Sequence, residues 1–450
     1  RDAVMMGLAD DGGLLIPDHV PDATDRMEAW RHLSYIDLAL EVMALFIDDI
    51  PREELKALVE KSYRNRFPGG VAPAIPVGPV HVLELFHGPT LAFKDVALQF
   101  LGNLFEAILA ARGGELNILA ATSGDTGSAA IHGVRGREHI RIFVMHPHGR
   151  VSPIQERQMT TVLDENVHNL ALEGTFDDTQ RILKTIAGDL AFKRRYALGA
   201  VNSVNWARVL AQVVYYIHAA LRVTVATGAP AVRFSVPTGN FGDILAGWYA
   251  LRMGAPIRRL VLATNCNDIL TRFFRTGEYR VGEVHATASP SMDIQVASNF
   301  ERYLYYRLGE DPARLRQAME GFASTGALTV EKTGRSVDPE FAAGSASEEE
   351  TLETIARYHR DYAYVLDPHT AVGVCVAEKT RGDSVPTVCL ATAHPAKFPD
   401  AVQRATGRED LAHHDRIADL AHRETRSTLL PATADAVRDY IVEALTTAQA

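Results

Sequence analysis

Apolar runs of strand length alternate with runs of helix length over much of the chain, and this alternation constrains the fold more than any other feature. The first block has strands predicted at 80–86, 116–121 and 140–145, with helices predicted between them at 92–111 and 126–134. Consecutive parallel strands need a crossover connection, which is usually a helix. The order therefore predicts a mainly parallel sheet with helices covering its faces.

A second alternating block follows a long predicted helix at 206–223. It contains strands at 232–236 and 258–263 around a helix at 242–253, and one more buried strand at 385–392. We therefore expect an α/β protein with two open, mainly parallel twisted sheets covered by helices. With 450 residues the chain exceeds the roughly 250–300 residues at which single cores stop growing, which also favours more than one domain.

The predicted domain boundaries follow from a proline-rich run at 73–79 and from the position of the second block. Residues 1–78 are expected to form a mostly helical N-terminal region that packs on the large domain. Residues 79–222 are expected to form a smaller α/β domain, and residues 223–450 a larger one. Each of the two α/β domains would contribute turns to a shared site.

Charge and cysteine content narrow the possible classes of function. The formal net charge is -10, whereas nucleic acids or anionic membranes as main partners require a basic surface. No stretch approaches the roughly 18 consecutive apolar residues of a membrane span. The cysteines Cys266, Cys375 and Cys389 form no CxxC pair and the 17 histidines show no HExxH pairing, so no metal site is indicated. We expect a cytoplasmic protein without nucleic-acid or membrane partners.

Turns that follow strands are where chemistry is expected, because ligands of open α/β sheets bind beyond the carboxyl ends of the strands. The first such turn, at 87–95, reads HGPTLAFKD and places Lys94 at a helix start. The helix dipole and an apolar setting disfavour the protonated amine there. Lys94 is therefore a candidate Schiff-base nucleophile, since imine formation needs the neutral amine. The alternative is a surface lysine beside Asp95 on an amphipathic helix.

The second and third turns combine glycine with small polar residues. The turn at 121–130 reads ATSGDTGSAA, which suits a carboxylate at a helix N-terminus or, alternatively, a tight turn capped by Ser123 or Thr126. The turn at 237–243 reads PTGNFGD, and its backbone N–H groups could wrap a phosphate. Asp243 would repel a bound phosphate, so we expect its side chain to cap the helix and point away.

The fourth turn, at 390–398, reads LATAHPAKF and ends the last predicted strand. The hydroxyl of Thr392 can hydrogen-bond a ring nitrogen without protonating it, while Lys397 and His394 could bind a second anion. The alternative is an exposed Lys397 and a His394 whose hydrogen bonds are satisfied in the core. Jointly the four turns supply what a pyridoxal-phosphate site needs: a lysine nucleophile, an anion-binding helix start, a phosphate cradle and a terminal threonine.

Further motifs lie along nearly the whole chain. They are GLA at 7–9, DGGL at 11–14, VSPIQERQM at 151–159, NSVNWAR at 202–208, SMDIQVASNFER at 291–302 and LDPHTAVG at 366–373. With these motifs and the four turns, the chain resembles the threonine synthase family, within the tryptophan synthase β-like fold type II of pyridoxal-phosphate enzymes. The resemblance implies that fold and a pyridoxal 5'-phosphate cofactor.

The resemblance also implies roles for individual residues. Lys94 would carry the cofactor and later act as the base that moves protons on the substrate, and Thr392 would face the ring nitrogen. The cofactor phosphate would be held by backbone amides of Gly239, Asn240, Phe241 and Gly242. The substrate would be bound by Ser123, Asp125, Thr126, Ser152, Arg157, Asn202, Ser203, Asn205, Arg208 and Lys397. Of these, Ser152, Arg157 and Lys397 are the candidates for the substrate's phosphate.

The implied reaction converts O-phospho-L-homoserine and water to L-threonine and phosphate, a β,γ-replacement that is the last step of threonine biosynthesis. The enzyme would be a carbon-oxygen lyase acting on phosphates, a monomer or homodimer with a small molecule as its partner. Two alternatives share the fold type: a phospholyase that releases 2-oxobutyrate, and a threonine or serine dehydratase. A non-catalytic homologue that senses an amino acid or phosphate is a third alternative, and the retention of Lys94 argues against it.

Overall fold

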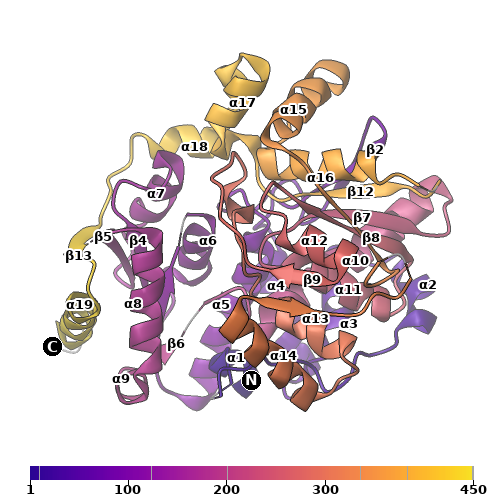
Figure 1. Ribbon diagram of the computed structural model, residues 1–450. Coiled ribbons are helices and arrows are strands. Elements are labelled where there is room, and N and C mark those ends of the chain that lie inside the picture. Colours follow the sequence, from indigo (N-terminus) through magenta and orange to yellow (C-terminus); the bar gives the residue numbers. More distant parts are fainter. Residues whose placement is uncertain (10, 123, 200, 335, 383, 448–450) are drawn as a thin grey trace.

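Two mainly parallel sheets form the framework of the computed structural model, which describes the chain except for residues 10, 123, 200, 335, 383 and 448–450 (Figure 1). The larger sheet has six strands in the order β1-β2-β12-β7-β8-β11, and the smaller has five in the order β13-β5-β4-β3-β6. Among these pairs only β1–β2 is antiparallel. The predicted fold class, an α/β protein with two open, mainly parallel sheets covered by helices, is confirmed.

The strands of both sheets are short and largely buried. The larger sheet comprises β1 Ala74–Val77, β2 Val80–Glu84, β7 Val232–Pro237, β8 Ile257–Thr264, β11 Phe341–Ser345 and β12 Thr387–Ala391. The smaller sheet comprises β3 Leu116–Ala121, β4 Ile140–Pro147, β5 Val167–Glu173, β6 Leu198–Gly199 and β13 Thr428–Pro431. A separate antiparallel pair joins β9 Glu278–Arg280 to β10 Ala327–Thr329. Every residue of β7 and β12 is buried, as is typical of parallel strands covered on both faces.

Helices cover the sheets and build the N-terminal region, whose predicted helical character is confirmed. That region contains α1 Asp2–Met6, α2 Met27–Trp30, α3 Tyr35–Met43 and α4 Arg52–Tyr63. The next helices are α5 Lys94–Arg112, α6 Asp125–Val134, α7 Pro153–Thr160, α8 Phe176–Gly188, α9 Leu190–Arg195, α10 Trp206–Thr227, α11 Gly242–Arg252 and α12 Ile269–Thr276. The last are α13 Phe300–Arg307, α14 Pro312–Thr325, α15 Glu348–Tyr362, α16 Pro368–Lys379, α17 Pro399–Thr406, α18 Asp415–Leu420 and α19 Ala434–Thr447.

The long helix α10 runs through the core and packs against α3, α5 and α11. Among the described residues it is the one helix that is long and apolar enough to cross a membrane, but 78% of its most apolar window is buried inside the protein. The side chain of Asn205 caps its start by accepting a hydrogen bond from the backbone N–H of Ala207 at 3.1 Å. The apolar composition of α10 therefore reflects a core helix, whose first turn is fixed in place.

Strand pairing departs from the predicted domain boundaries at two points, one at the start of the smaller domain and one near the end of the larger domain. The sequence places 80–86 in the smaller domain, but β2 pairs in parallel with β12 of the larger sheet. The sequence places the C-terminus in the larger domain, but β13 pairs in parallel with β5 of the smaller sheet. A buried strand of either sheet has the same apolar pattern, so the local sequence does not specify a partner hundreds of residues away.

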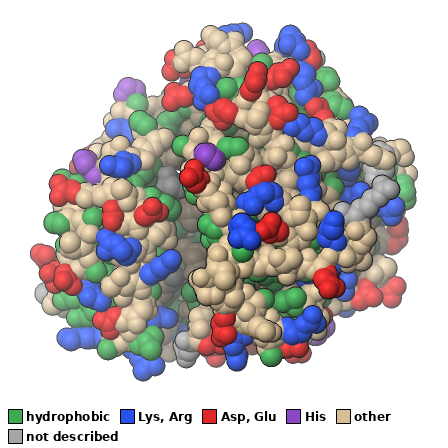
Figure 2. All heavy atoms as spheres, viewed as in Figure 1, with side chains coloured by type: hydrophobic (Ala, Val, Ile, Leu, Met, Phe, Trp, Pro, Cys, Tyr) green, Lys and Arg blue, Asp and Glu red, His purple; other side chains and the backbone are tan. Residues whose placement is uncertain are grey.

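A narrow furrow separates the unit built on the smaller sheet from the unit built on the larger sheet on the face shown in Figure 2. Figure 1 shows α18 above this junction, with α7 and α8 of the smaller unit on one side and α15, α16 and α17 on the other. Contacts between α18 and α7 fasten the C-terminal segment to the smaller unit. The turns that the sequence selected lie along the junction.

Candidate active site

A cavity of about 90 Å³ lies where the turns after β7 and β12 meet the starts of α5, α6 and α10. Its wall contains Lys94 at the start of α5, Thr392 directly after β12 and Arg208 in the first turn of α10. The other predicted site residues that line it are Thr126, Ser203, Gly239, Asn240, Phe241 and Gly242. The structure thus brings together all six residues that the sequence assigned to the cofactor.

Lys94 is buried and occupies the N-terminal position of α5. Burial is the main cause that lowers the pKa of its amine, and the ammonium of Lys397 and the guanidinium of Arg208 lower it further, while Asp125 opposes them. The Nζ atom lies 3.8 Å from Oδ2 of Asp125, within ion-pair distance. Lys94 is therefore a lysine with an increased neutral fraction, as a nucleophile or base requires, and the surface-lysine alternative is wrong.

Asp125 is the carboxylate around which the buried cations gather. Its Oδ1 lies 2.7 Å from Nζ of Lys397 and accepts a hydrogen bond from Nε2 of Gln155 at 2.8 Å. Burial alone would raise the pKa of Asp125, but the ammonium groups of Lys397 and Lys94 hold it well below its usual range. Lys397 also donates to the carbonyl of Thr90 at 2.9 Å, so it is a buried structural cation and the exposed-lysine alternative is wrong.

The glycine turn after β7 is closely packed, most tightly at Gly239, where a larger residue does not fit. A Cβ atom added to Gly239 would lie 2.5 Å from the carbonyl oxygen of Ser291, and one added to Gly242 would lie 3.1 Å from Nδ2 of Asn299. Phe241 adopts a left-handed conformation with φ of 65° just before α11 begins. The N–H groups of a first helical turn have no partner within the helix, so this turn is suited to hold a phosphate without a cation.

Two backbone hydrogen bonds tie the lysine-bearing turn to the turn after β12. Ala92 and Ala393 form an antiparallel bridge, in which the N–H of Phe93 donates to the carbonyl of Thr392 at 2.8 Å. The N–H of His394 donates back to the carbonyl of Leu91 at 3.0 Å. Lys94 and Thr392 are therefore held in register on one wall of the cavity.

Arg208 is a buried cation without a compensating charge in the described part of the chain. It is 4% exposed, and its Nε and Nη1 atoms are buried without a hydrogen-bond partner among the described residues. Burial lowers the pKa of its guanidinium to about 10. An unpaired buried charge is costly unless an anion completes it. The residues of the cavity therefore fit an anionic cofactor or substrate.

Asp243 does not behave as the sequence predicted. The expected helix cap is wrong, because α11 has no side-chain cap and Asp243 instead accepts hydrogen bonds from the hydroxyls of Tyr215 at 2.5 Å and Tyr216 at 2.9 Å. Its carboxylate lines the cavity, and burial raises its pKa to about 6. The two tyrosine hydroxyls, rather than the helix N-terminus, stabilise this carboxylate beside the glycine turn.

Six described residues that were predicted to bind substrate do not line the cavity: Asp125 and Lys397, which pair with each other, and four more that are each held by a structural bond. Arg157 donates to the carbonyls of Leu420, Ala421 and Arg423 at the end of α18, which differs from its predicted role with the substrate's phosphate. Ser152 caps α7, Asn202 accepts from the N–H of Val204, and Asn205 caps α10. Ser123 lies outside the described residues. Cap-forming and carbonyl-binding side chains look the same in sequence as ligand-binding ones.

Gln212, which lines the cavity, and Tyr215, which bonds a lining residue, lie outside the motifs. Gln212 lies one turn after Arg208 on α10, and Tyr215 holds Asp243 from the following turn. Their spacing of four and seven residues from Arg208 places the three side chains on one face of α10, and this spacing could have identified them from the sequence. His369, from the motif at 366–373, also lines the cavity, and its Nε2 accepts a hydrogen bond from the N–H of Ser291 while its Nδ1 bonds Asp367.

Three family models match this chain and together cover most of it. "Threonine synthase N terminus" matches residues 1–63, "Pyridoxal-phosphate dependent enzyme" matches residues 72–393, and "Threonine synthase, C-terminal" matches residues 370–441. The second model alone spans more than half of the sequence and includes every residue that lines the cavity.

The chain belongs to the threonine synthase family. It is 48% identical to the threonine synthase of Pseudomonas aeruginosa, over 96% of this chain and 92% of that protein. It is 46% identical to the threonine synthase of Saccharomyces cerevisiae, over 90% of this chain and 86% of that protein. The sequence similarity to these two enzymes therefore includes the helical N-terminal region as well as the two sheets.

Solved threonine synthases have the same fold. A pyridoxal-phosphate-bound threonine synthase from Brucella melitensis is 44% identical with a TM-score of 0.92, covering 98% of this chain and 96% of that one. A threonine synthase from yeast is 42% identical with a TM-score of 0.93, covering 99% and 96%. Pyridoxal phosphate is accordingly the cofactor of this threonine synthase family member, an enzyme of fold type II.

Proposed function

We propose that this chain converts O-phospho-L-homoserine and water to L-threonine and inorganic phosphate, as the last step of threonine biosynthesis. The observation that carries the proposal is the cavity that combines buried Lys94, a glycine turn and the guanidinium of Arg208, which has no charged partner among the described residues. The extent of identity to threonine synthases supports the same reaction.

We assign the cofactor to residues that line one cavity. Lys94 would attach it covalently, the backbone amides of Gly239 to Gly242 would hold its phosphate, and the hydroxyl of Thr392 would face its ring nitrogen. When bound, pyridoxal phosphate acidifies the carbon–hydrogen bonds next to the substrate's amine by delocalising negative charge. A neutral threonine hydroxyl can accompany that ring without protonating it.

Lys94 is the residue we assign to proton transfer. Burial lowers the pKa of its amine, which increases the fraction able to accept a proton from substrate carbon. The carboxylate of Asp125 lies 3.8 Å away and can stabilise the ammonium that forms. Lys397 would act through Asp125, because its ammonium already binds that carboxylate and the carbonyl of Thr90.

The substrate carries a carboxylate and a phosphate, and the site must bind both. Arg208 provides an unpaired buried cation, and Thr126 lies in the first turn of α6, where backbone N–H groups favour an anion. We assign these residues, with Ser203, to substrate binding. Arg157 is not included, because its guanidinium is occupied by three carbonyls.

The decisive experiment separates the synthase from a phospholyase of the same fold. The cofactor-loaded protein is mixed with O-phospho-L-homoserine, and threonine, 2-oxobutyrate and phosphate are quantified together. Threonine formed in equal amount to phosphate supports the proposal. Phosphate matched by 2-oxobutyrate would assign the chain to the phospholyases, and no turnover at all would favour a binding role.

We also propose that the protein acts in the cytoplasm as a monomer or homodimer. The cysteines Cys266, Cys375 and Cys389 are free thiols in the structure, which suits a reducing compartment. Sedimentation of the cofactor-loaded protein tests the oligomeric part, since a tetramer or larger assembly would contradict it.

A further inference from the structure

A second cavity, of about 440 Å³, lies behind the wall that carries Lys94 and Thr392. The bridge between Ala92 and Ala393 separates the two cavities. Lys94 and Thr392 line the active-site cavity. Leu91 and His394, which belong to the same two turns, line the second cavity. A ligand in the second cavity would therefore touch the wall that carries Lys94, from its opposite side.

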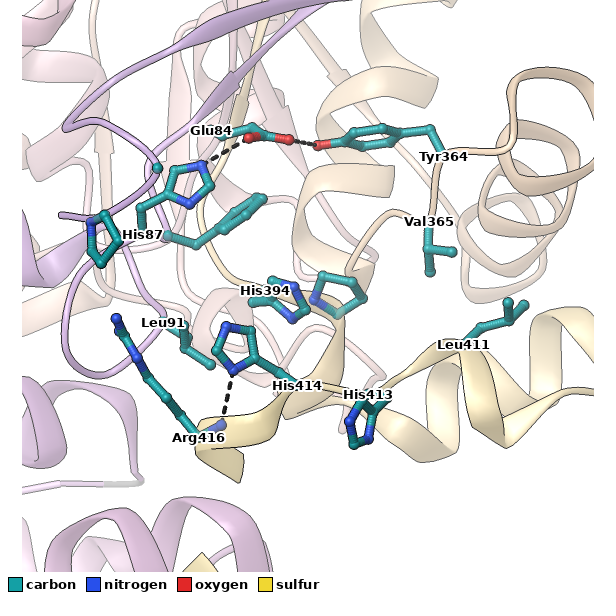
Figure 3. Close-up of a pocket in the computed structure, with 14 residues that line it drawn as sticks. Glu84, His87, Leu91, Tyr364, Val365, His394, Leu411, His413, His414 and Arg416 are labelled. Atoms are coloured by element: carbon teal, nitrogen blue, oxygen red, sulfur yellow. Dashed lines mark hydrogen bonds and ion pairs between the residues drawn. The ribbon is translucent and has the colours of Figure 1, made fainter. Parts of the chain in front are cut away.

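Two histidines in this cavity present N–H donors. The Nδ1 atom of His394 accepts a hydrogen bond from the N–H of Ala396, and Nδ1 of His414 accepts one from the N–H of Arg416, both at 3.1 Å. A neutral imidazole that accepts at Nδ1 carries its proton on Nε2. Burial lowers the pKa of both rings, to about 4 for His394, so both are neutral donors near pH 7. Figure 3 shows the two rings next to each other.

Arg416 adds a cation to these donors. Its Nη1 donates to the carbonyl of Gly88 at 2.8 Å, and the other guanidinium N–H groups, which have no hydrogen-bond partner among the described residues, are left for a ligand. Glu84 is the one carboxylate among the described residues that line the cavity. Its oxygens are already bonded, one to the hydroxyl of Tyr364 at 2.7 Å and the other to Nε2 of His87 at 2.8 Å. The free donors therefore favour an anion.

The surroundings of Arg416 are also basic, although the protein carries a net charge of -10. An adjoining hollow of about 360 Å³ shares Arg416 and is lined by Arg66, Arg135 and Arg423, with no carboxylate among its described lining residues. Arg135 pairs with Asp164 and Arg423 pairs with Asp419, both outside that lining, so these two cations are largely neutralised. Arg66 and Arg416 then remain to attract an anion. Phe86, Leu91, Val365 and Leu411 form an apolar part of the wall of the larger cavity, which also contains the polar side chains of His87, Tyr364 and His413.

We propose that the second cavity binds a small organic phosphate: His394, His414 and Arg416 donate to its phosphate group while its organic part packs on the apolar wall. Three donors in the wall of one cavity suit a phosphate, which accepts several hydrogen bonds, and the volume lies within the range of small-molecule sites, which is about 300–1,000 Å³. The bound phosphate would fasten α18 to the turn that carries Lys94. The site is independent of the reaction proposed above.

The test uses the holoenzyme with its cofactor reduced onto Lys94 by borohydride, so that the active-site cavity is filled. Inorganic phosphate and phenyl phosphate are titrated by calorimetry into this protein and into the variants Arg416→Gln and His414→Phe. We expect one site that prefers phenyl phosphate, and a loss of affinity of about 10- to 100-fold in each variant, since each removes a hydrogen bond to a charged group. Arg408→Gln, an exposed pair with Asp410 outside the cavity, serves as the control and should bind as the parent does.

Three results would overturn the proposal. The first is the absence of phenyl phosphate binding to the reduced holoenzyme at millimolar concentration. The second is unchanged binding in both Arg416→Gln and His414→Phe. The third is equal affinity for inorganic phosphate and phenyl phosphate, which would remove the role of the apolar wall. Because His414 also caps α18, Arg416→Gln provides the variant that leaves this cap in place.

Discussion

Replacement of Asp125 by asparagine tests whether this carboxylate supports the cavity. The change keeps the shape but removes the charge from a residue that is 5% exposed and lies 2.7 Å from Nζ of Lys397, whose side chain is fully buried. Breaking one partner of a buried ion pair costs about 3–5 kcal/mol, because the other charge is left uncompensated. We expect a fall of that size in the free energy of unfolding of the cofactor-free protein, measured by urea titration with tryptophan fluorescence near pH 7.

The pH dependence gives the same prediction an independent readout. The folded pKa of Asp125 is held below the unfolded value, so its stabilisation is present above the unfolded pKa of about 4 and is lost as pH falls towards the folded pKa. The variant should therefore lose less stability than the parent between roughly pH 5 and pH 3. Asp410→Asn, which breaks an exposed pair with Arg408, is the control and should leave unfolding unchanged. If Asp125→Asn unfolds at the urea concentration of the parent, the buried pair does not support the cavity.

Three further substitutions address the cofactor and the substrate. Lys94→Ala should abolish the absorption band of lysine-linked cofactor, and a retained band would place the attachment elsewhere. Gly239→Ala should weaken cofactor affinity by about 1–3 kcal/mol, because its Cβ would lie 2.5 Å from the carbonyl oxygen of Ser291. The control is Gly321→Ala, where nothing lies within 4 Å of the added Cβ, and it should bind the cofactor with the affinity of the parent. Arg208→Gln should keep the cofactor spectrum but lower kcat/KM for O-phospho-L-homoserine about 100-fold, and an unchanged kcat/KM would exclude Arg208 from substrate binding.

Local sequence was sufficient for the features that depend on neighbouring residues. The alternation of strand and helix predicted the parallel sheets, and the turns after strands predicted the position of Lys94, Gly239 and Thr392 in one cavity. This works because parallel strands place their carboxyl ends at the same edge, so residues far apart in sequence meet there. The position of a residue after a strand therefore carried more information than its type.

Pairing and side-chain direction could not be predicted in the same way. β2 and β12 are adjacent in the larger sheet although about 300 residues separate them, and a buried apolar strand would suit either sheet. The directions of the Asp243 and Arg157 side chains could not be predicted for a similar reason. Their partners are the hydroxyl of Tyr215 and the carbonyls after α18, which reach them only through the tertiary fold.

The charges of the cavity explain how an acidic protein can bind two anionic molecules. Lys94, Lys397 and Arg208 are buried cations around the site, and Asp125 is the carboxylate whose pKa is held low enough to neutralise one of them fully. Buried Asp243 and Asp95 also interact with these cations, and although burial raises the pKa of each to about 6, both are mostly ionised near pH 7. Arg208 nevertheless has no carboxylate partner among the described residues, and the net charge of -10 has little influence on it, because exposed charges beyond about 10 Å are screened by salt. Anionic ligands supply the missing compensation, which is why the buried guanidinium of Arg208 can remain unpaired in the folded protein.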